Sequence, residues 1–219
     1  MEFIYECDDV FPVDFCNRVI DKFEKSNLKI TGRVGGGEID PIKQSTDLRI
    51  YDEPEWVEEE KYFQVMIRKA VKKYETFLLK MDVDDEVKKH MSDLLMNTYI
   101  HPPQIQRTEP GQYYHWHEDE DYPPNWKAFT YLIYLNDVEK DSGGTTEFSC
   151  GKIIQPKAGK IVFFPCTWTY FHRGKTLEKG VKYIATNGLF IEPLREVVLS
   201  RREREERNKP VLPFIISSK

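Results

Sequence analysis

The chain has 219 residues, of which 40% are hydrophobic and 13% aromatic, so it can bury a sizeable core and is not a disordered protein. Its formal net charge of −5 makes nucleic acid an unlikely partner, because a phosphate backbone binds basic surfaces. The N-terminus lacks the basic start and apolar run of a signal peptide, and no apolar segment approaches the roughly 20 residues that cross a bilayer. We therefore expect no membrane partner and a cytoplasmic location.

The four cysteines lie far apart in the sequence, and none forms a Cys-x-x-Cys pair. They are Cys7, Cys16, Cys150 and Cys166. Sparse cysteines in a chain of this length predict reduced and mostly buried thiols, which agrees with a cytoplasmic protein.

The first part of the chain reads as mainly helical. A helix is predicted over 13–25, where Phe15, Cys16, Val19, Ile20 and Phe23 share one face, and Pro12 suits its start. Apolar residues at spacings of three and four predict a long helix over 55–80, and a shorter helix is expected over 84–95. Residues 1–11 predict an edge strand. The glycine-rich stretch 28–50 predicts a long loop or irregular hairpin, either a plain connector or a flap beside a site.

From about residue 96 the pattern changes to short strands rich in Tyr, Ile, Val, Phe and Thr. The predicted strands are 97–101, 103–108, 111–118, 127–136, 144–149, 152–156, 160–165, 169–172 and 180–192. Short, evenly spaced strands predict an α+β, mainly β fold, a double-stranded β-helix or jelly-roll (cupin-like) barrel with the N-terminal helices packed against it.

We expect one domain over residues 1–219. It comprises helical support over 1–95, the barrel over 96–192 and a C-terminal tail over 193–219. Mixed charges over Arg201–Lys209 predict a solvated helix. The apolar run Pro210–Ile216 is expected to dock on its own domain or on a second copy, so a homodimer through this tail is one expectation.

Three residues indicate a metal site. His117 and Asp119 stand two apart on a predicted strand, and side chains at that spacing point the same way. His172 lies 53 positions beyond Asp119 and supplies a further imidazole. Two histidines and one carboxylate on one side of a metal are typical of non-haem Fe(II) oxygenases, which keep the opposite side open.

The sequence around these residues strengthens the hypothesis. Gly111-Gln-Tyr-Tyr precedes the pair, and three further segments lie between Asp119 and His172: Tyr131–Asp137, Ser142–Phe148 and Gln155–Phe164. This order resembles the Fe(II)- and 2-oxoglutarate-dependent dioxygenases, specifically the prolyl 4-hydroxylase α-subunit-like branch. The resemblance covers about residues 96–192.

The resemblance implies that His117, Asp119 and His172 are the iron ligands and catalytic residues. It implies that Lys182, ten positions after His172, pairs with the distal carboxylate of 2-oxoglutarate. A dicarboxylate buried in a barrel requires a fixed cation, or its desolvation is not offset. Tyr134, Thr146 and Tyr114 match positions that line the same pocket or stand beside the metal.

The implied cofactors are Fe(II), 2-oxoglutarate and O2, with ascorbate as a further expectation. The implied reaction hydroxylates a C–H bond, with succinate and CO2 as co-products.

Three positions depart from the branch. A tyrosine common nine positions before the first ligand is Thr108 here, and a basic residue that is often arginine is Lys127. A tryptophan common six positions after the cofactor lysine is Gly188. The first departure alters hydrogen bonding to the cofactor, and the other two stand where peptide substrates dock.

Alternatives exist for single residues. His115 also stands two positions from His117 and is an alternative ligand. Lys160 or Arg173 is the alternative cation for 2-oxoglutarate if Lys182 does not bind it. Trp116, Trp126 and Trp168 are candidates for stacking on a substrate ring, although packing at the core or rim is the simpler interpretation.

Alternatives also exist for the function. A prolyl residue in a protein or peptide is the first substrate hypothesis, and a free amino acid or another small molecule is the second. A cupin that binds metal without hydroxylating is disfavoured, because its second motif places a histidine three residues after Pro-x-Gly, whereas His172 is thirteen after Gly159. A binding module without turnover is disfavoured by the intact ligands and Lys182. Nucleic-acid demethylation is disfavoured by Lys182, where an arginine is expected, and by the negative charge.

Overall fold

A central β-sandwich with helices on one side forms the body of the molecule in the computed structural model, which describes residues 2–34, 37–51, 53–119 and 126–191. The helices are α1 (Val13–Lys25), α2 (Val57–Leu79) and α3 (Asp85–Met96), with short 3-10 turns η2 (Pro54–Trp56), η3 (Lys140–Ser142) and η4 (Trp168–Tyr170). The strands are β1 (Tyr5–Cys7), β2 (Ile30–Thr31), β3 (Thr46–Arg49), β4 (Thr98–Ile100), β5 (Gln104–Thr108), β6 (Tyr114–His117), β7 (Lys127–Tyr134), β8 (Thr146–Phe148), β9 (Ile153–Ile154), β10 (Ile161–Pro165), β11 (His172–Gly174) and β12 (Lys182–Ile191).

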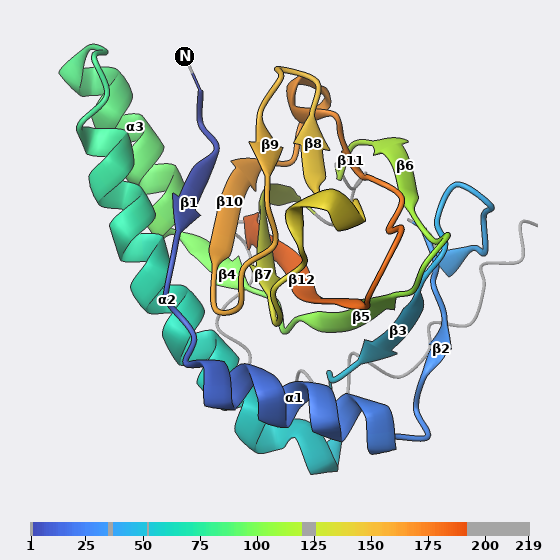
Figure 1. Cartoon of the computed structure of the whole chain (residues 1–219). Coiled ribbons are helices and arrows are strands. Elements are labelled where there is room, and N and C mark those ends of the chain that lie inside the picture. The colour runs from blue at the N-terminus through green and yellow to red at the C-terminus, as the bar shows by residue number, and fades with distance from the viewer. Residues whose placement is uncertain (1, 35–36, 52, 120–125, 192–219) are drawn as a thin grey trace, which may run out of the picture.

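The strands form two antiparallel sheets. The larger has the order β1-β10-β7-β12-β5-β3-β2, with β4 paired to β12, and the smaller has the order β6-β11-β8-β9. Figure 1 shows the smaller sheet on the side away from the helices, while α1, α2 and α3 follow the outside of the larger sheet. The predicted α+β, mainly β jelly-roll is therefore confirmed.

Strand β7 of the larger sheet contributes side chains to two hydrophobic cores, one on each face of the sheet. Phe129, Tyr131 and Ile133 alternate toward the helices and join the core that contains Phe63 and Tyr74 of α2. Between them, side chains of β7 point into the space between the sheets, where a second core forms with Phe148 and Ile154 of the smaller sheet. Because both faces of β7 are buried, the strand reads as a nearly continuous apolar run.

The helices agree closely with the sequence. The predicted face of 13–25 buries Phe15, Cys16, Val19 and Phe23, and only Ile20 is partly exposed. The predicted face of 55–80 is buried along α2, and η2 precedes that helix. Among the described residues no helix has the length and apolar character that crossing a membrane requires.

The structure extends one prediction and contradicts another. The stretch 28–50 is an irregular hairpin, which is one of the two predicted forms, and in addition its strand β3 pairs with β5 and so extends the larger sheet. The predicted strand 169–172 is wrong, because η4 occupies most of it and the strand β11 begins only at His172. Gly35, Gly36 and the whole tail 193–219, with its expected dimer contact, lie outside the described residues.

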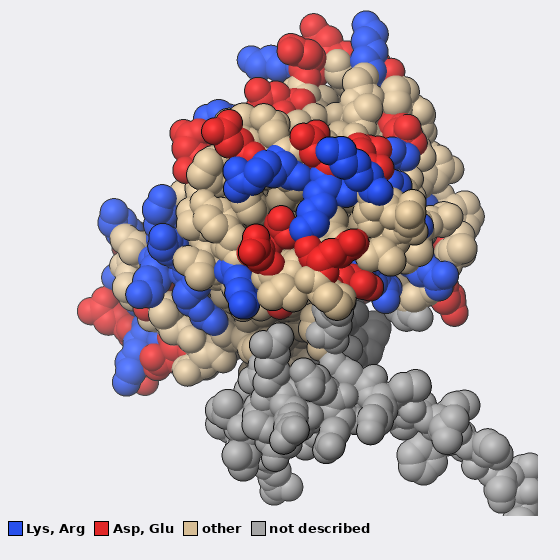
Figure 2. Space-filling view, turned by 90° about the horizontal axis from the view of Figure 1, so that it is seen from below, with Lys and Arg blue, Asp and Glu red and all other residues tan. Residues whose placement is uncertain are grey.

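Cysteine burial follows the prediction, since Cys7, Cys16 and Cys166 are buried and Cys150 is exposed, and none of these four cysteines is in a disulfide. On the face drawn in Figure 2, basic and acidic side chains are interspersed over most of the surface. That mixture is unlike the continuous basic stripe expected of a nucleic-acid-binding face.

Candidate metal centre and cofactor pocket

His117 and His172 lie opposite each other in the smaller sheet, because β6 and β11 pair antiparallel with these residues in register. The centres of their imidazole rings are 4.2 Å apart. Two residues separated by half of the barrel sequence are thus brought together by one strand pair.

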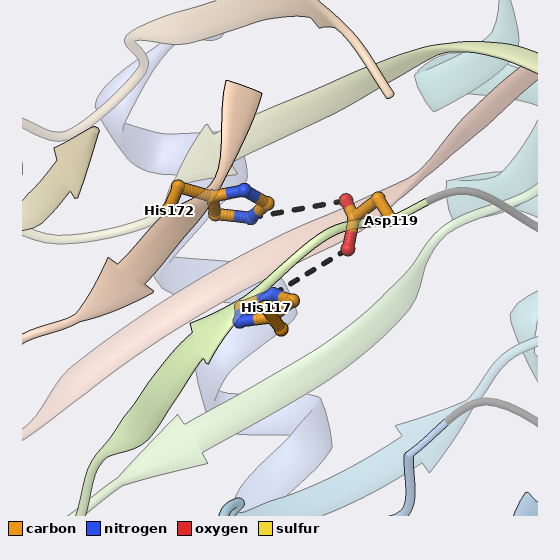
Figure 3. A group of neighbouring side chains, drawn as sticks. All are labelled: His117, Asp119 and His172. Carbon is orange, nitrogen blue, oxygen red and sulfur yellow. Dashed lines mark ion pairs between the residues drawn. The ribbon is translucent and has the colours of Figure 1, made fainter. Parts of the chain in front are cut away.

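The carboxylate of Asp119 completes the cluster two residues beyond His117. Its Oδ1 atom lies 3.4 Å from Nε2 of His117, and its Oδ2 atom lies 3.9 Å from Nε2 of His172. Figure 3 shows the carboxylate facing both rings. One ligand atom from each residue lies within 4.8 Å of the others, a spacing that suits three ligands on a shared ion.

Backbone contacts fix which nitrogen of each ring faces the cluster. Nδ1 of His117 lies 2.7 Å from the carbonyl oxygen of His115, and Nδ1 of His172 lies 3.1 Å from that of Tyr170. A carbonyl oxygen only accepts, so each Nδ1 donates a proton, and the neutral form of each ring then has its lone pair on Nε2. Such contacts behind the ring are the usual way in which a metal-binding histidine is oriented.

The charge states also suit a divalent cation. Burial lowers the pKa of His172 to about 4, against the opposing effect of Asp119. Burial would raise the pKa of Asp119, but the Lys127 ammonium and then His172 hold it well below its usual range. A neutral imidazole and an ionised carboxylate are the forms that bind metal, so the donor set fits the Fe(II) that the sequence implies.

His115 does not join the cluster, so the structure contradicts it as an alternative ligand. Between His172 and Gly174, β11 advances two residues while β6 advances three, from His117 back to Tyr114. This β-bulge breaks the alternation of side chains on which the alternative depended. His115 is exposed and packs against Tyr113, whereas the ring of Tyr114 stacks on His117 with 3.5 Å between ring centres.

A cleft of about 440 Å³ opens beside the three candidate ligands. Its inner part lies between the sheets and is lined by Thr108, Thr130, Leu132, Thr146, Lys182 and Ile184. Its outer part runs between the 28–46 hairpin on one side and the segment His101–Gln104 with Tyr51 on the other.

Lys182 is a buried cation in the inner part of this cleft. Its side chain donates to the carbonyl oxygen of Gly144 at 2.9 Å, and only 5% of the residue is exposed. Within the described ranges no carboxylate lies within ion-pair distance of it, and burial lowers its pKa to about 8. A buried ammonium with one carbonyl partner fits the carboxylate of a ligand such as 2-oxoglutarate.

The two alternative cations are engaged elsewhere. Lys160 pairs with Glu6 at 2.8 Å, and Arg173 pairs with Glu147 at 2.6 Å while its guanidinium lies over Trp116. Neither lines the cleft. Of the three cations considered from the sequence, Lys182 is therefore the one that lines the cleft.

Of the other predicted cofactor residues, two line the cleft and one lies behind its lining. Thr146 lines the cleft, whereas Tyr134 is buried behind it and donates its hydroxyl to Oγ1 of Thr146 at 2.7 Å. Tyr134 therefore acts through Thr146. Tyr114 lines the cleft beside His117, and burial raises the pKa of its hydroxyl.

The three tryptophans considered for substrate stacking do not reach the cleft. Trp116, Trp126 and Trp168 are exposed, and none is among the residues that line it. The three departures from the family pattern, by contrast, all lie at the site. Thr108 and Lys127 line the cleft, and Gly188 packs directly under the Lys127 side chain.

Sequence reasoning missed Thr130 and the pair Lys43–Asp47. Thr130 donates to Oδ2 of Asp119 at 2.7 Å. Thr130, Leu132 and Tyr134 alternate along β7, so their side chains point to the same face, between the two sheets. This spacing could have identified Thr130 from the sequence. Lys43 lines the cleft and forms a buried ion pair with Asp47 at 2.7 Å.

Comparisons with known proteins point to one family. Residues 103–188 match the model of the 2OG-Fe(II) oxygenase superfamily. No curated protein matches the sequence.

Several solved structures share the fold. A viral collagen prolyl hydroxylase of Paramecium bursaria Chlorella virus-1, solved as its 2OG complex, has a TM-score of 0.60 and 23% identity over 87% of this chain and 97% of that chain. A Trichoplax adhaerens prolyl hydroxylase, solved with a peptide fragment of the hypoxia-inducible factor, has a TM-score of 0.66 and 16% identity over 87% of this chain and 84% of that chain. A Pseudomonas putida prolyl-4-hydroxylase has a TM-score of 0.61 and 13% identity over 88% and 94% of the two chains.

At these identities the solved structures establish the fold alone. The family match is independent of them, and its range contains His117, Asp119, His172 and Lys182. Residues 103–188 of the chain are therefore similar to the 2OG-Fe(II) oxygenase superfamily, and they include all the candidate metal ligands.

Proposed function

We propose that this protein hydroxylates a prolyl residue in a peptide or protein, with Fe(II) bound by His117, Asp119 and His172 and 2-oxoglutarate bound at Lys182. The observation that carries the proposal is a cluster of two imidazoles and one carboxylate, placed to share a metal ion, beside a buried lysine that has no carboxylate partner in the described part of the chain. When bound, iron and 2-oxoglutarate supply the oxidising power that inserts one oxygen atom of O2 into a C–H bond, with succinate and CO2 as co-products.

The residues of the chain would hold and orient the reactants. Lys182 would bind the distal carboxylate of 2-oxoglutarate, since the ammonium lines the cleft and, among the described residues, uses one of its three N–H donors, toward Gly144. Thr146, held by Tyr134, would offer its hydroxyl to the same carboxylate. Leu132 and Ile184 line the same pocket and would keep water from it.

The outer part of the cleft favours a peptide over a free amino acid. It is bordered by Arg33 and Gln44 of the 28–46 hairpin on one side, and by Tyr51 and His101 on the other. An open groove of this kind accepts an extended chain whose target residue reaches inward to the metal. The viral and Trichoplax proteins of the same fold are described as prolyl hydroxylases, which makes proline the first residue to test.

The proposal is tested by mass spectrometry of the products. Purified protein is incubated with Fe(II), 2-oxoglutarate and air together with proline-rich peptides, the same peptides with alanine for proline, or free amino acids. Ascorbate, an expectation from the family, is present in one of two parallel series. We expect a mass increase of one oxygen atom on the proline peptides alone, with a matching amount of succinate. Hydroxylation of free amino acids without peptide hydroxylation would overturn the peptide proposal.

An Asp119→Ala variant serves as the control for the chemistry. It lacks the only carboxylate of the triad, so it should give neither hydroxylated peptide nor succinate. Product formation by this variant would show that the iron site lies elsewhere.

A further inference from the structure

The two oxygens of the Asp119 carboxylate lie in different surroundings. Oδ1 faces Nε2 of His117 at 3.4 Å. Oδ2 accepts a hydrogen bond from Thr130 at 2.7 Å and also lies 3.4 Å from the ammonium of Lys127. Thr130 and Lys127 are both on β7, three positions apart, and a β-strand irregularity between β7 and β12 occurs next to Lys127. Oδ2 is thus engaged by one hydrogen bond and one ion pair from β7, and Oδ1 is left to bind a metal.

The side chain of Lys127 reaches Asp119 by crossing Gly188. A Cβ atom at Gly188 would lie 2.6 Å from Cε of Lys127, 2.7 Å from Cγ and 2.9 Å from Cδ. Carbon atoms do not approach this closely, so any side chain at position 188 would displace Lys127 from its present path. The backbone at Gly188 has no positive φ, so it is the space over Gly188, and not its conformation, that requires glycine.

These contacts link two departures of the sequence from the related family. The family commonly has a tryptophan at the position of Gly188 and often an arginine at that of Lys127. In this chain the methylene stem of Lys127 fills the space over position 188, and 11% of the Lys127 side chain is exposed. The small residue at position 188 and the path of Lys127 therefore depend on each other.

We propose that Lys127 is a positioning residue for the metal ligand Asp119, and that Gly188 leaves the space that lets the Lys127 side chain reach it. Lys127 and Thr130 together hold Oδ2, so that the carboxylate binds metal through Oδ1. The proposal deepens the proposed oxygenase function and rests on it for the identity of the metal, but not for the contacts themselves. Protein groups that hydrogen-bond to a metal-binding carboxylate commonly change metal affinity by about 10- to 100-fold when removed.

The test is a double-mutant cycle with metal affinity as its readout. Lys127→Ala, Gly188→Ala and the double variant are titrated anaerobically with Mn(II) by calorimetry, without 2-oxoglutarate and without turnover. We expect the dissociation constant to rise about tenfold in Lys127→Ala. A similar rise is expected in Gly188→Ala, because its methyl group displaces the lysine. In the Lys127→Ala background the same methyl group meets no lysine stem, so the second substitution should add less than a twofold change.

Two further variants separate positioning from simple folding effects. Lys127→Arg keeps a cation and its donors and should restore affinity to within about threefold of wild type, while Thr130→Val should weaken binding and Thr130→Ser should not. Melting temperatures are measured for every variant, and if Gly188→Ala fails to fold, the Lys127 and Thr130 variants still decide the positioning role.

Each outcome has a distinct meaning. An unchanged or lower dissociation constant in Lys127→Ala would overturn the positioning role, since it would mean that the ammonium does not help Asp119 to bind the metal. Additive effects of Lys127→Ala and Gly188→Ala would overturn the link between the two positions. Wild-type protein that binds no Mn(II) would overturn the metal site and this proposal together, whereas metal binding without prolyl hydroxylation would contradict the proposed substrate alone.

Discussion

Lys182 lies directly opposite Thr108 where β12 pairs with β5, and both residues line the inner end of the cleft. The family pattern has a tyrosine at the position of Thr108, and that ring would share the pocket with the lysine. The shorter threonine alters the hydrogen bonding that the resemblance implies for the cofactor. We therefore expect the binding of 2-oxoglutarate to depend heavily on Lys182.

Removal of the lysine should weaken 2-oxoglutarate binding without disturbing the metal site. Lys182→Ala removes a charged hydrogen-bond donor worth about 1.5–3 kcal/mol, which corresponds to a KM for 2-oxoglutarate raised roughly 10- to 150-fold. The Mn(II) dissociation constant should change less than about twofold, because Lys182 contacts no metal ligand. Succinate assays and calorimetry measure the two quantities, with Lys179→Ala as the matched control on an exposed lysine. An unchanged KM would mean that a cation other than Lys182 binds the distal carboxylate of 2-oxoglutarate.

The pKa of Lys182 also predicts a pH dependence for cofactor binding. Burial lowers the pKa to about 8 in the free protein, so Lys182 is ionised below that pH and increasingly neutral above it. Binding a dicarboxylate requires the ionised form. The 2-oxoglutarate dissociation constant should be flat from pH 6.5 to 7.5 and then rise by up to tenfold per pH unit above about 8. A Lys182→Arg variant stays ionised and should give a flat profile throughout, whereas parallel profiles for the two proteins would contradict the role of Lys182.

The same lysine should lower the stability of the ligand-free fold at neutral pH. Its folded-state pKa lies below the ordinary value of 10.5, so the folded state disfavours the charged form. The destabilisation is fully present below pH 8 and is relieved as the pH rises toward 10.5. Lys182→Met should therefore raise the unfolding free energy at pH 7, by at most about 3 kcal/mol, while it weakens 2-oxoglutarate binding as Lys182→Ala does. Denaturant unfolding at pH 7 measures this effect, and a less stable variant would show that the ammonium is compensated in the fold.

The hydrogen bond from Tyr134 to Thr146 should support the cofactor pocket from behind. Tyr134→Phe leaves the Thr146 hydroxyl without its buried donor and should cost about 1 kcal/mol of stability, with a KM for 2-oxoglutarate raised a few-fold. Because the tyrosine acts through the threonine, Tyr134→Phe in a Thr146→Val background should have little further effect on KM. Additive effects on KM in this pair of variants would instead mean that Tyr134 acts on the cofactor by another route.

The ion pair between Lys43 and Asp47 should hold the 28–46 hairpin at the cleft. Both side chains are 3% exposed, and Lys43 also donates to the carbonyl oxygen of Arg33. Asp47→Ala leaves the lysine buried without its counter-charge and should lower the unfolding free energy by about 3–5 kcal/mol. Replacement of both residues, as Lys43→Met with Asp47→Leu, should lose less than the single variant. Thermal unfolding compares them, and an equal or larger loss in the double variant would contradict the buried-charge explanation.

Much of the fold was predictable, because its signals are local. The helices at 13–25 and 55–80 follow from apolar spacing, and most barrel strands follow from short β-branched and aromatic runs bounded by turns. The metal cluster was predictable from His117 and Asp119 at strand spacing, supported by the order of the flanking segments. In each case neighbouring residues carry the information.

The rest depends on contacts between distant segments. Nothing in the residues 114–117 alone indicates the β-bulge that separates His115 from His117, since the bulge arises from pairing with β11. The pairing of β3 with β5 and the path of Lys127 across Gly188 are likewise set by segments far apart in sequence. Patterns along one segment do not contain such relationships.

The most direct test of the metal site is the stoichiometry and residue dependence of Fe(II) binding. Under anaerobic conditions the wild-type protein should bind one Fe(II) per chain, and His117→Ala, Asp119→Ala and His172→Ala should each lose measurable binding, while His115→Ala binds as wild type does. Undiminished binding by any of the first three variants, or loss of binding in His115→Ala, would contradict the assignment of the ligands.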